Sequence, residues 1–73
     1  MKRIEALKKL EAMGEDWDEA TIETSRGSFF CGKLVAVPQV LFDCEQGRKN
    51  LGTVRSSEEF LDKIEGRIKS ITI

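Results

Sequence analysis

The first apolar positions of the chain predict a helix. They lie three residues apart, on one face of an amphipathic helix: Ile4, Leu7, Leu10 and Met13. Gly14 follows the last of them, at the place where a left-handed glycine commonly ends a helix. The pattern predicts a helix over residues 2–13, and the charged residues 15–19 that follow predict a loop.

The next segment changes to a period of two, which is typical of a strand with one buried face. Ile22 and Thr24 fall on the same face of this strand. A polar turn over residues 25–28 joins it to a second strand. The length of that turn predicts that Thr24 lies opposite Phe29 and that Ile22 lies opposite Cys31.

The second strand is expected to run to about Val37, because Pro38 has no amide proton and disfavours continued pairing. Gly32 interrupts this strand. It is interpreted as a bulge, which would change the side-chain phase beyond it. A two-residue turn at Gly32 and Lys33 is the alternative.

A third strand is predicted over residues 40–45, with Val40 and Phe42 on the core side. The polar residues 46–50 that follow predict a turn. Residues 51–54 form a short and weak candidate for a fourth strand, because a glycine lies inside it.

The last third of the chain predicts a second helix over residues 57–69. Ser56 precedes Glu59 by three residues, which is the spacing of a capping box. One apolar stripe follows at helical spacing: Phe60, Leu61, Ile64 and Ile68. Gly66 is expected on the solvent face of this helix, and residues 70–73 form either its last turn or a short extra strand.

These elements predict a single α+β domain over residues 1–73. It has an N-terminal helix, an antiparallel meander of three to four strands and a C-terminal helix. Both faces of the sheet are apolar between residues 29 and 42. The apolar residues on the face opposite the core are Phe30, Val35, Val37 and Leu41. A second layer from the chain itself, a closed barrel, a second copy or a protein partner could cover that face.

The rhythm of the central segment also resembles a known architecture. The run TIETSRGSFFCGKLVAV is similar to the alternation of strands and glycine turns in small SH3-like and Sm-like barrels, and a helix precedes it as in the Sm-like family. The resemblance implies a small barrel with flanking helices as the alternative fold. Val37, Pro38 and Gln39 stand where the Sm-like family has the Asp and Asn that hold RNA, so no RNA-binding residue carries over.

Composition and charge narrow the possible functions. The 73 residues are 40% hydrophobic and 34% charged, which is typical of a folded globule. A domain of this size buries only about 60% of its unfolded surface, so association with another chain is a common source of stability. Residues 1–37 carry six Lys and Arg against seven Asp and Glu, and residues 38–73 carry six against six. This balance disfavours non-specific binding of nucleic acid.

Residue types that carry common chemistry are few. The chain has no His or Tyr and two cysteines, Cys31 and Cys44, without zinc-ligand spacing. Both cysteines lie in apolar contexts, which indicates inert core thiols more than a thiol enzyme. We therefore expect no enzyme, metal or cofactor. Because no apolar run could span a bilayer and no signal segment is evident, we expect a cytoplasmic location.

Two groups of side chains remain as candidate binding residues. Trp17 lies between acidic residues and is either an anchor for a partner or a lid over a thin core. Four basic residues fall in or beside predicted turns and could form an edge for nucleic acid: Arg26, Arg48, Lys49 and Arg55. The sequence favours a non-catalytic protein-binding or regulatory module, as a homodimer or an accessory subunit. We expect it to bind through Trp17 and the second sheet face, with nucleic-acid binding as the alternative.

Overall fold

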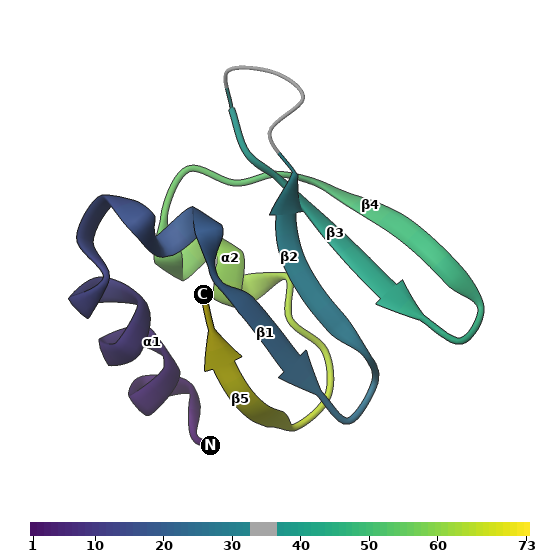
Figure 1. Cartoon of the computed structure of the whole chain (residues 1–73), viewed down its shortest axis with the longest axis horizontal. Helices are drawn as coiled ribbons and strands as arrows, with labels where there is room; N and C mark the ends of the chain where they lie inside the picture. Colours follow the sequence, from purple (N-terminus) through teal and green to yellow (C-terminus); the bar gives the residue numbers. More distant parts are fainter. Residues whose placement is uncertain (33–36) are drawn as a thin grey trace.

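The computed structural model of the chain describes residues 1–32 and 37–73. It is an α+β fold in which an N-terminal helix and a short C-terminal helix accompany an open antiparallel sheet (Figure 1). The elements in chain order are α1 (Arg3–Ala12), η1 (Gly14–Glu19), β1 (Thr21–Thr24), β2 (Ser28–Gly32), β3 (Gln39–Cys44), β4 (Gly47–Thr53), α2 (Ser57–Asp62) and β5 (Ile68–Thr72). The strand order is β4-β3-β2-β1-β5. The predicted fold class is thus confirmed, and the described sheet has one strand more than predicted.

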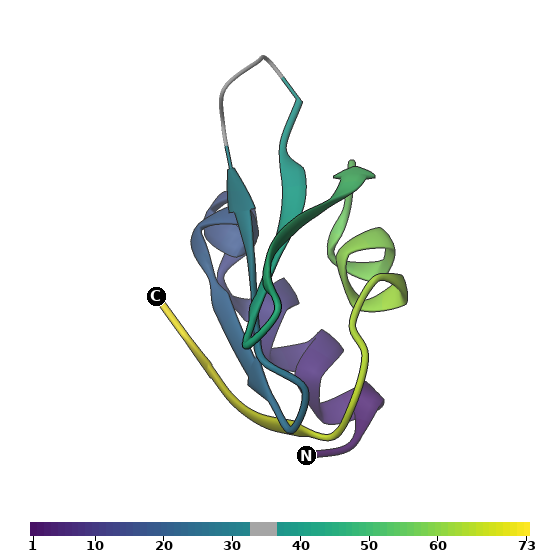
Figure 2. The ribbon, with the colours of Figure 1, turned by 90° about the vertical axis from the view of Figure 1, so that its right-hand side faces the viewer.

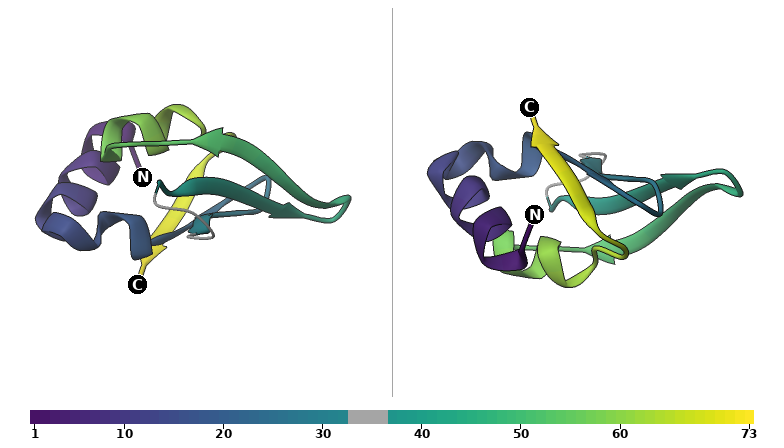
Figure 3. Two further views of the ribbon diagram at one scale, coloured as in Figure 1. Left: turned by 90° about the horizontal axis from the view of Figure 1, so that it is seen from above. Right: turned by 90° about the horizontal axis from the view of Figure 1, so that it is seen from below.

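The core lies between the sheet and the two helices. Figures 2 and 3 show the sheet curving, with α1 and α2 on the side toward which it curves. We call the sheet surface that meets the helices the inner face. Its buried side chains include Ile22, Phe29, Val40 and Phe42, and the rings of Phe29 and Phe42 stack with centroids 4.3 Å apart. Phe60 of α2 and Leu10 of α1 complete this core with no exposed surface.

The first helix forms as the apolar spacing predicts. α1 buries Ala6 and Leu10 and ends at Ala12, and Gly14 follows with φ +63°, the conformation expected at this stop. Ile4 is 57% exposed and lies outside the core. The segment predicted as a loop over residues 15–19 is instead part of the 3-10 helix η1.

The predicted register of the first hairpin is wrong by two residues. Ile22 pairs with Phe29 instead of Cys31, because Thr24 closes a tighter turn than expected. The main-chain nitrogen of Thr24 donates to Gly27 O at 2.9 Å, and its Oγ1 accepts from the nitrogens of Arg26 and Gly27. A shift of two keeps every side chain on its predicted face.

The second strand is shorter than predicted. β2 ends at Gly32, which pairs with Gln39 of β3, and Val37 lies in a bend instead of a strand. The ladder from Ser28 to Gly32 is regular, so no bulge occurs before that point. The expected positions of residues 33–36, including the predicted turn at Gly32 and Lys33, lie outside the described residues.

The turn between the third and fourth strands is also displaced from its predicted place. The chain reverses at Glu45 and Gln46, and β4 begins at Gly47. Of the residues predicted as a polar turn, Gln46 lies in the turn and residues 47–50 belong to β4, which pairs with β3 along most of its length. Their polar composition reflects an exposed edge strand, where charged side chains are common.

The second helix ends early, and its predicted second half is a strand. Ser56 Oγ accepts a hydrogen bond from the Glu59 main-chain nitrogen at 3.2 Å, as the capping box predicts. α2 nevertheless stops at Asp62, and Gly66 has φ +88°, a conformation incompatible with a helix. Ile68 and Ile71 are buried from β5, which pairs with β1. The alternative of an extra strand at the C-terminal end is therefore the correct one.

The sheet is not closed into the alternative barrel. β4 and β5 stand at the two ends of the described strand order and do not pair with each other. In sequence, α2 connects these two edge strands, and it packs against α1 and contributes Phe60 and Leu61 to the core. The helices cover the inner face in this way, and no helix in the described parts of the chain lies on the opposite face.

Candidate binding face of the sheet

The surface of the sheet opposite the helices is the strongest candidate for a functional site. Because side chains alternate along each strand and the registers are known, its members can be assigned. We call this surface the outer face. Its residues on β1 to β4 are Thr21, Glu23, Ser28, Phe30, Gln39, Leu41, Asp43, Arg48 and Asn50.

Two apolar side chains lie at the centre of the outer face. Phe30 of β2 pairs directly with Leu41 of β3, and both side chains are half-buried. Leu41 lies over Gly32, since a Cβ atom on that glycine would come within 2.9 Å of Leu41 Cδ1. Because Gly32 has no side chain, Leu41 packs directly against the backbone of β2, which accounts for part of its burial.

Arg48 covers part of Phe30 from within the chain. Its guanidinium carbon lies 5.1 Å from the centroid of the Phe30 ring, which is within the range of a cation–π contact. The same guanidinium lies 3.5 Å from Asp43 Oδ2, and both side chains are about half exposed. An exposed pair of this kind contributes little to stability, so Arg48 can exchange these contacts for others at a small energetic cost.

A polar rim surrounds the apolar pair. Ser28 Oγ donates to Glu23 Oε2 at 2.6 Å, and Asn50 Nδ2 donates to Gln39 Oε1. The rim also carries opposite charges at its two sides: the negative charge of Glu23 lies on β1 and the positive charge of Arg48 lies on β4. An apolar centre with a polar rim is the common arrangement of protein–protein interfaces.

The predicted apolar set is only partly assembled. Phe30 and Leu41 are neighbours on the outer face, Val37 is half-buried in the bend before β3, and Val35 lies outside the described residues. Trp17 belongs to the core instead. Its ring centroid is 6.2 Å from that of Phe60, and the side chain packs against the buried cluster. This contact corresponds to the lid alternative for Trp17.

The four basic candidates do not form one edge. Arg26 lies in the β1–β2 turn, and Arg48 lies on the outer face. Lys49 pairs with Phe42, which places it on the inner-face side of β4. Arg55 follows the far end of β4, on the order of 20 Å along the strand from Arg48 at about 3.3 Å per residue. The geometry therefore gives no special support to a nucleic-acid site.

Both cysteines lie on the inner-face side, and neither is part of a disulfide. Cys31 and Cys44 are half-buried and pack against the core. Cys31 pairs with Val40, four residues from Cys44 along β3, so roughly 13 Å of strand separates the two positions. That separation is too long for a disulfide. Among residues 1–32 and 37–73 no group of three or more metal-ligand side chains occurs.

Sequence reasoning did not predict the contact of Arg48 with Phe30, because Arg48 was assigned to a turn. The opposite charges of Asp43 and Arg48, on the two sides of a short polar turn, would have been the only signal in the sequence.

Within the described parts of the chain, no helix has the length and apolar character needed to cross a membrane. Comparison with family models, curated proteins and solved structures found no match.

Proposed function

We propose that this protein is a non-catalytic protein-binding module and that the outer face of its sheet is the binding surface. The observation that supports this proposal is the pair formed by Phe30 and Leu41, which lie side by side on a face that no described helix covers. Aromatic and arginine side chains contribute most strongly to binding energy at interfaces. Phe30 and Arg48 supply both types at one place.

The shape of this face limits the strength of the interaction. The sheet curves away from the outer face (Figure 3), so a partner contacts mainly β2 and β3. A contact limited to two short strands buries little surface, so we place this interface at the lower end of specific interfaces, below about 1,200 Å² in total. We therefore expect a reversible complex with a dissociation constant in the micromolar range or weaker.

A second copy of the chain satisfies the requirements of this face. A two-fold axis parallel to the strands, between β2 and β3, reverses the strand order across the interface. In the dimer that we propose, the strand registers bring Phe30 opposite the partner's Leu41 and Arg48 opposite the partner's Glu23. The interface is thus complementary to itself in both its apolar and its charged positions.

Sedimentation velocity over about 10 to 500 µM protein tests this proposal. We expect the sedimentation coefficient to rise with concentration. Leu41→Lys should abolish the rise, whereas Ile4→Lys, at an exposed apolar site on α1, should not. Arg48→Glu should weaken association, and the double variant Arg48→Glu with Glu23→Arg should restore it. A chain that stays monomeric throughout this range excludes the second copy as the partner.

The wider proposal of a protein-binding module has its own test. Tagged wild-type protein, the Leu41→Lys variant and the Ile4→Lys control are compared in quantitative capture from an extract of the source cells. A protein that is retained by the control and lost with Leu41→Lys supports the outer face as the binding surface. If every captured protein is retained equally by all three, the outer face has no such role.

A further inference from the structure

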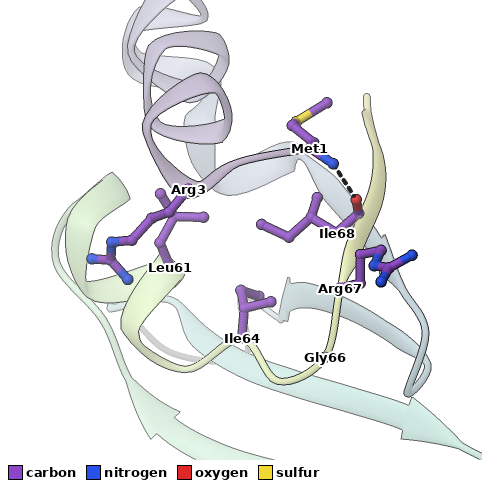
Figure 4. Close-up of a pocket in the computed structure, with 7 residues that line it drawn as sticks. All are labelled: Met1, Arg3, Leu61, Ile64, Gly66, Arg67 and Ile68. Atoms are coloured by element: carbon purple, nitrogen blue, oxygen red, sulfur yellow. Dashed lines mark hydrogen bonds between the residues drawn. The ribbon is translucent and has the colours of Figure 1, made fainter.

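A groove lies away from the outer face, where three segments of the chain converge (Figure 4). It is formed by the start of α1, the residues after α2 and the start of β5, and its volume is about 210 Å³. The residues that line it are Met1, Arg3, Leu61, Ile64, Gly66, Arg67 and Ile68. None of them belongs to the outer face.

The floor of the groove is aliphatic. Figure 4 shows the side chains of Leu61, Ile64 and Ile68 directed into the space between α1 and β5. Leu61 and Ile68 are 3% and 8% exposed, so they are fixed by the core beneath them. The N-terminal ammonium of Met1 donates to Ile68 O at 3.0 Å, which links the two walls and adds a positive charge to the lining of the groove.

The rim of the groove is cationic. Its lining contains two arginines and no carboxylate. Arg3 is paired with Asp62, with Nη2 2.7 Å from Oδ1, so its charge is largely balanced. No ion-pair partner for Arg67 is found among the residues that the structure describes. Arg67 therefore provides an unbalanced positive charge beside an apolar floor.

The backbone of Arg67 is held in place although its side chain is free. The Arg67 nitrogen donates to Ser25 Oγ at 2.9 Å, and the Ser25 nitrogen donates to Arg67 O at 2.9 Å. The side chain is exposed, and Figure 4 shows its guanidinium turned outward from the hollow. A rotation about side-chain bonds could bring the guanidinium over the rim without moving the main chain, at the cost of ordering one long side chain.

We propose that this groove is a binding site for an aliphatic carboxylate, with the chain on Leu61, Ile64 and Ile68 and the carboxylate on Arg67. A volume of about 210 Å³ is smaller than the roughly 300–1,000 Å³ of sites for drug-sized ligands, so the groove suits a smaller molecule. That corresponds to a short acyl chain or to the C-terminal residue of a peptide with an aliphatic side chain. Because arginine binds carboxylates in a bidentate manner, it is suited to either source.

Two simpler ligand classes satisfy only part of the site. A neutral alkyl group would leave Arg67 without a partner, and inorganic phosphate would leave the aliphatic floor exposed to water. For a ligand of this size the dissociation constant should be in the millimolar range. This inference is independent of the outer face and of its proposed partner.

Titration followed by methyl and amide NMR shifts tests the proposal. The probes are hexanoate, N-acetyl-leucine as the mimic of a peptide end, and hexanol as the neutral control. We expect saturable shifts at Leu61, Ile64 and Ile68 with one or both carboxylates, and weaker binding of hexanol. The carboxylate that binds more tightly identifies the source of the ligand.

Charge variants complete the test. Arg67→Gln should weaken carboxylate binding by about two- to five-fold, as expected for one exposed charge, and Arg67→Lys should weaken it less. Arg55→Gln is the matched control and should leave binding unchanged. Shifts that do not saturate, equal binding of hexanol and hexanoate, or no effect of Arg67→Gln would overturn the proposal.

Discussion

Replacing Gly66 with alanine distinguishes a helical from a non-helical conformation of residues 63–69. The sign of the change in the free energy of unfolding differs between the two. If the apolar stripe after Ser56 continued as a helix to residue 69, Gly66 would lie on its exposed face. Alanine would then stabilise the protein by about 1 kcal/mol, the difference in helix propensity. In the structure Gly66 has φ +88°, where an L-side chain is strained, so alanine should destabilise it.

The magnitude follows from the backbone and from the neighbouring atoms. A left-handed conformation costs a non-glycine residue roughly 1–2 kcal/mol. A Cβ atom on Gly66 would also come within 2.7 Å of Arg26 Cγ and 2.8 Å of Ser25 Oγ. These side chains can move, but Ser25 Oγ would then lose its bond from Arg67, at about 1 kcal/mol. We expect a total destabilisation of about 2–3 kcal/mol.

Gly14→Ala is the matched control for this variant. Gly14 also has a left-handed backbone, with φ +63°, but an added Cβ atom would meet nothing within 4 Å. This variant should therefore show the backbone cost alone, about 1–2 kcal/mol. The difference between the two variants measures the steric contribution of the Ser25–Arg26 turn packed against Gly66.

Urea unfolding followed by the fluorescence of Trp17 measures both values. The indole packs near Phe60 in the folded state, so its emission reports loss of the core. The free energy of unfolding is compared at an unchanged m-value. A Gly66→Ala protein as stable as the wild type, or more stable, would show that residues 63–69 form a helix in solution and would refute the proposed path of the chain to β5.

Three further variants test other parts of the fold by the same unfolding assay. Phe29→Ala removes a ring that is fully buried and stacked on Phe42, so it should cost about 3–5 kcal/mol and leave most of the protein unfolded at 37 °C, as measured by circular dichroism. Ser56→Ala removes the only side-chain cap on α2 given by the described residues and should cost about 1 kcal/mol, whereas Ser56→Asp should retain most of the stability. Arg3→Ala breaks an exposed pair with Asp62; it should change stability by less than about 1 kcal/mol, and the effect should shrink further in 1 M salt.

The sequence was sufficient where a local pattern and the tertiary contacts agree. The helix at residues 3–12 follows from its apolar spacing and from the glycine after it, and both strands of the first hairpin follow from their alternation. The error in the hairpin register did not change which face of the sheet each side chain was assigned to, because a shift of two residues preserves the faces. Phe30 and Leu41 were therefore placed correctly on the face opposite the core.

The remaining errors arise where local preference and tertiary pairing disagree. Ile64 and Ile68 continue the apolar spacing of α2, yet Ile68 lies in a strand and is buried there. The segment after Gly66 forms this strand because it pairs with the edge of β1. Pairing between residues so distant in sequence leaves no periodic signal. The first half of β4 was predicted as a turn for a related reason: its polar composition is that of an edge strand, which resembles the composition of a loop.

The arrangement of the core bears on how any self-association should behave. Among the described residues, the buried hydrophobic side chains lie in the helices, on the inner face and in the segments beside them, and none belongs to the outer face. We therefore expect the fold to form without a partner. Association through the outer face should then add stability only by mass action. At a protein concentration ten-fold above the dissociation constant this contribution is about 1.4 kcal/mol, and at one tenth of it the contribution is close to zero. The unfolding midpoint should therefore rise modestly with protein concentration in the wild type and remain constant in Leu41→Lys. A chain that unfolds on dilution would instead indicate that the outer face is part of an obligate core.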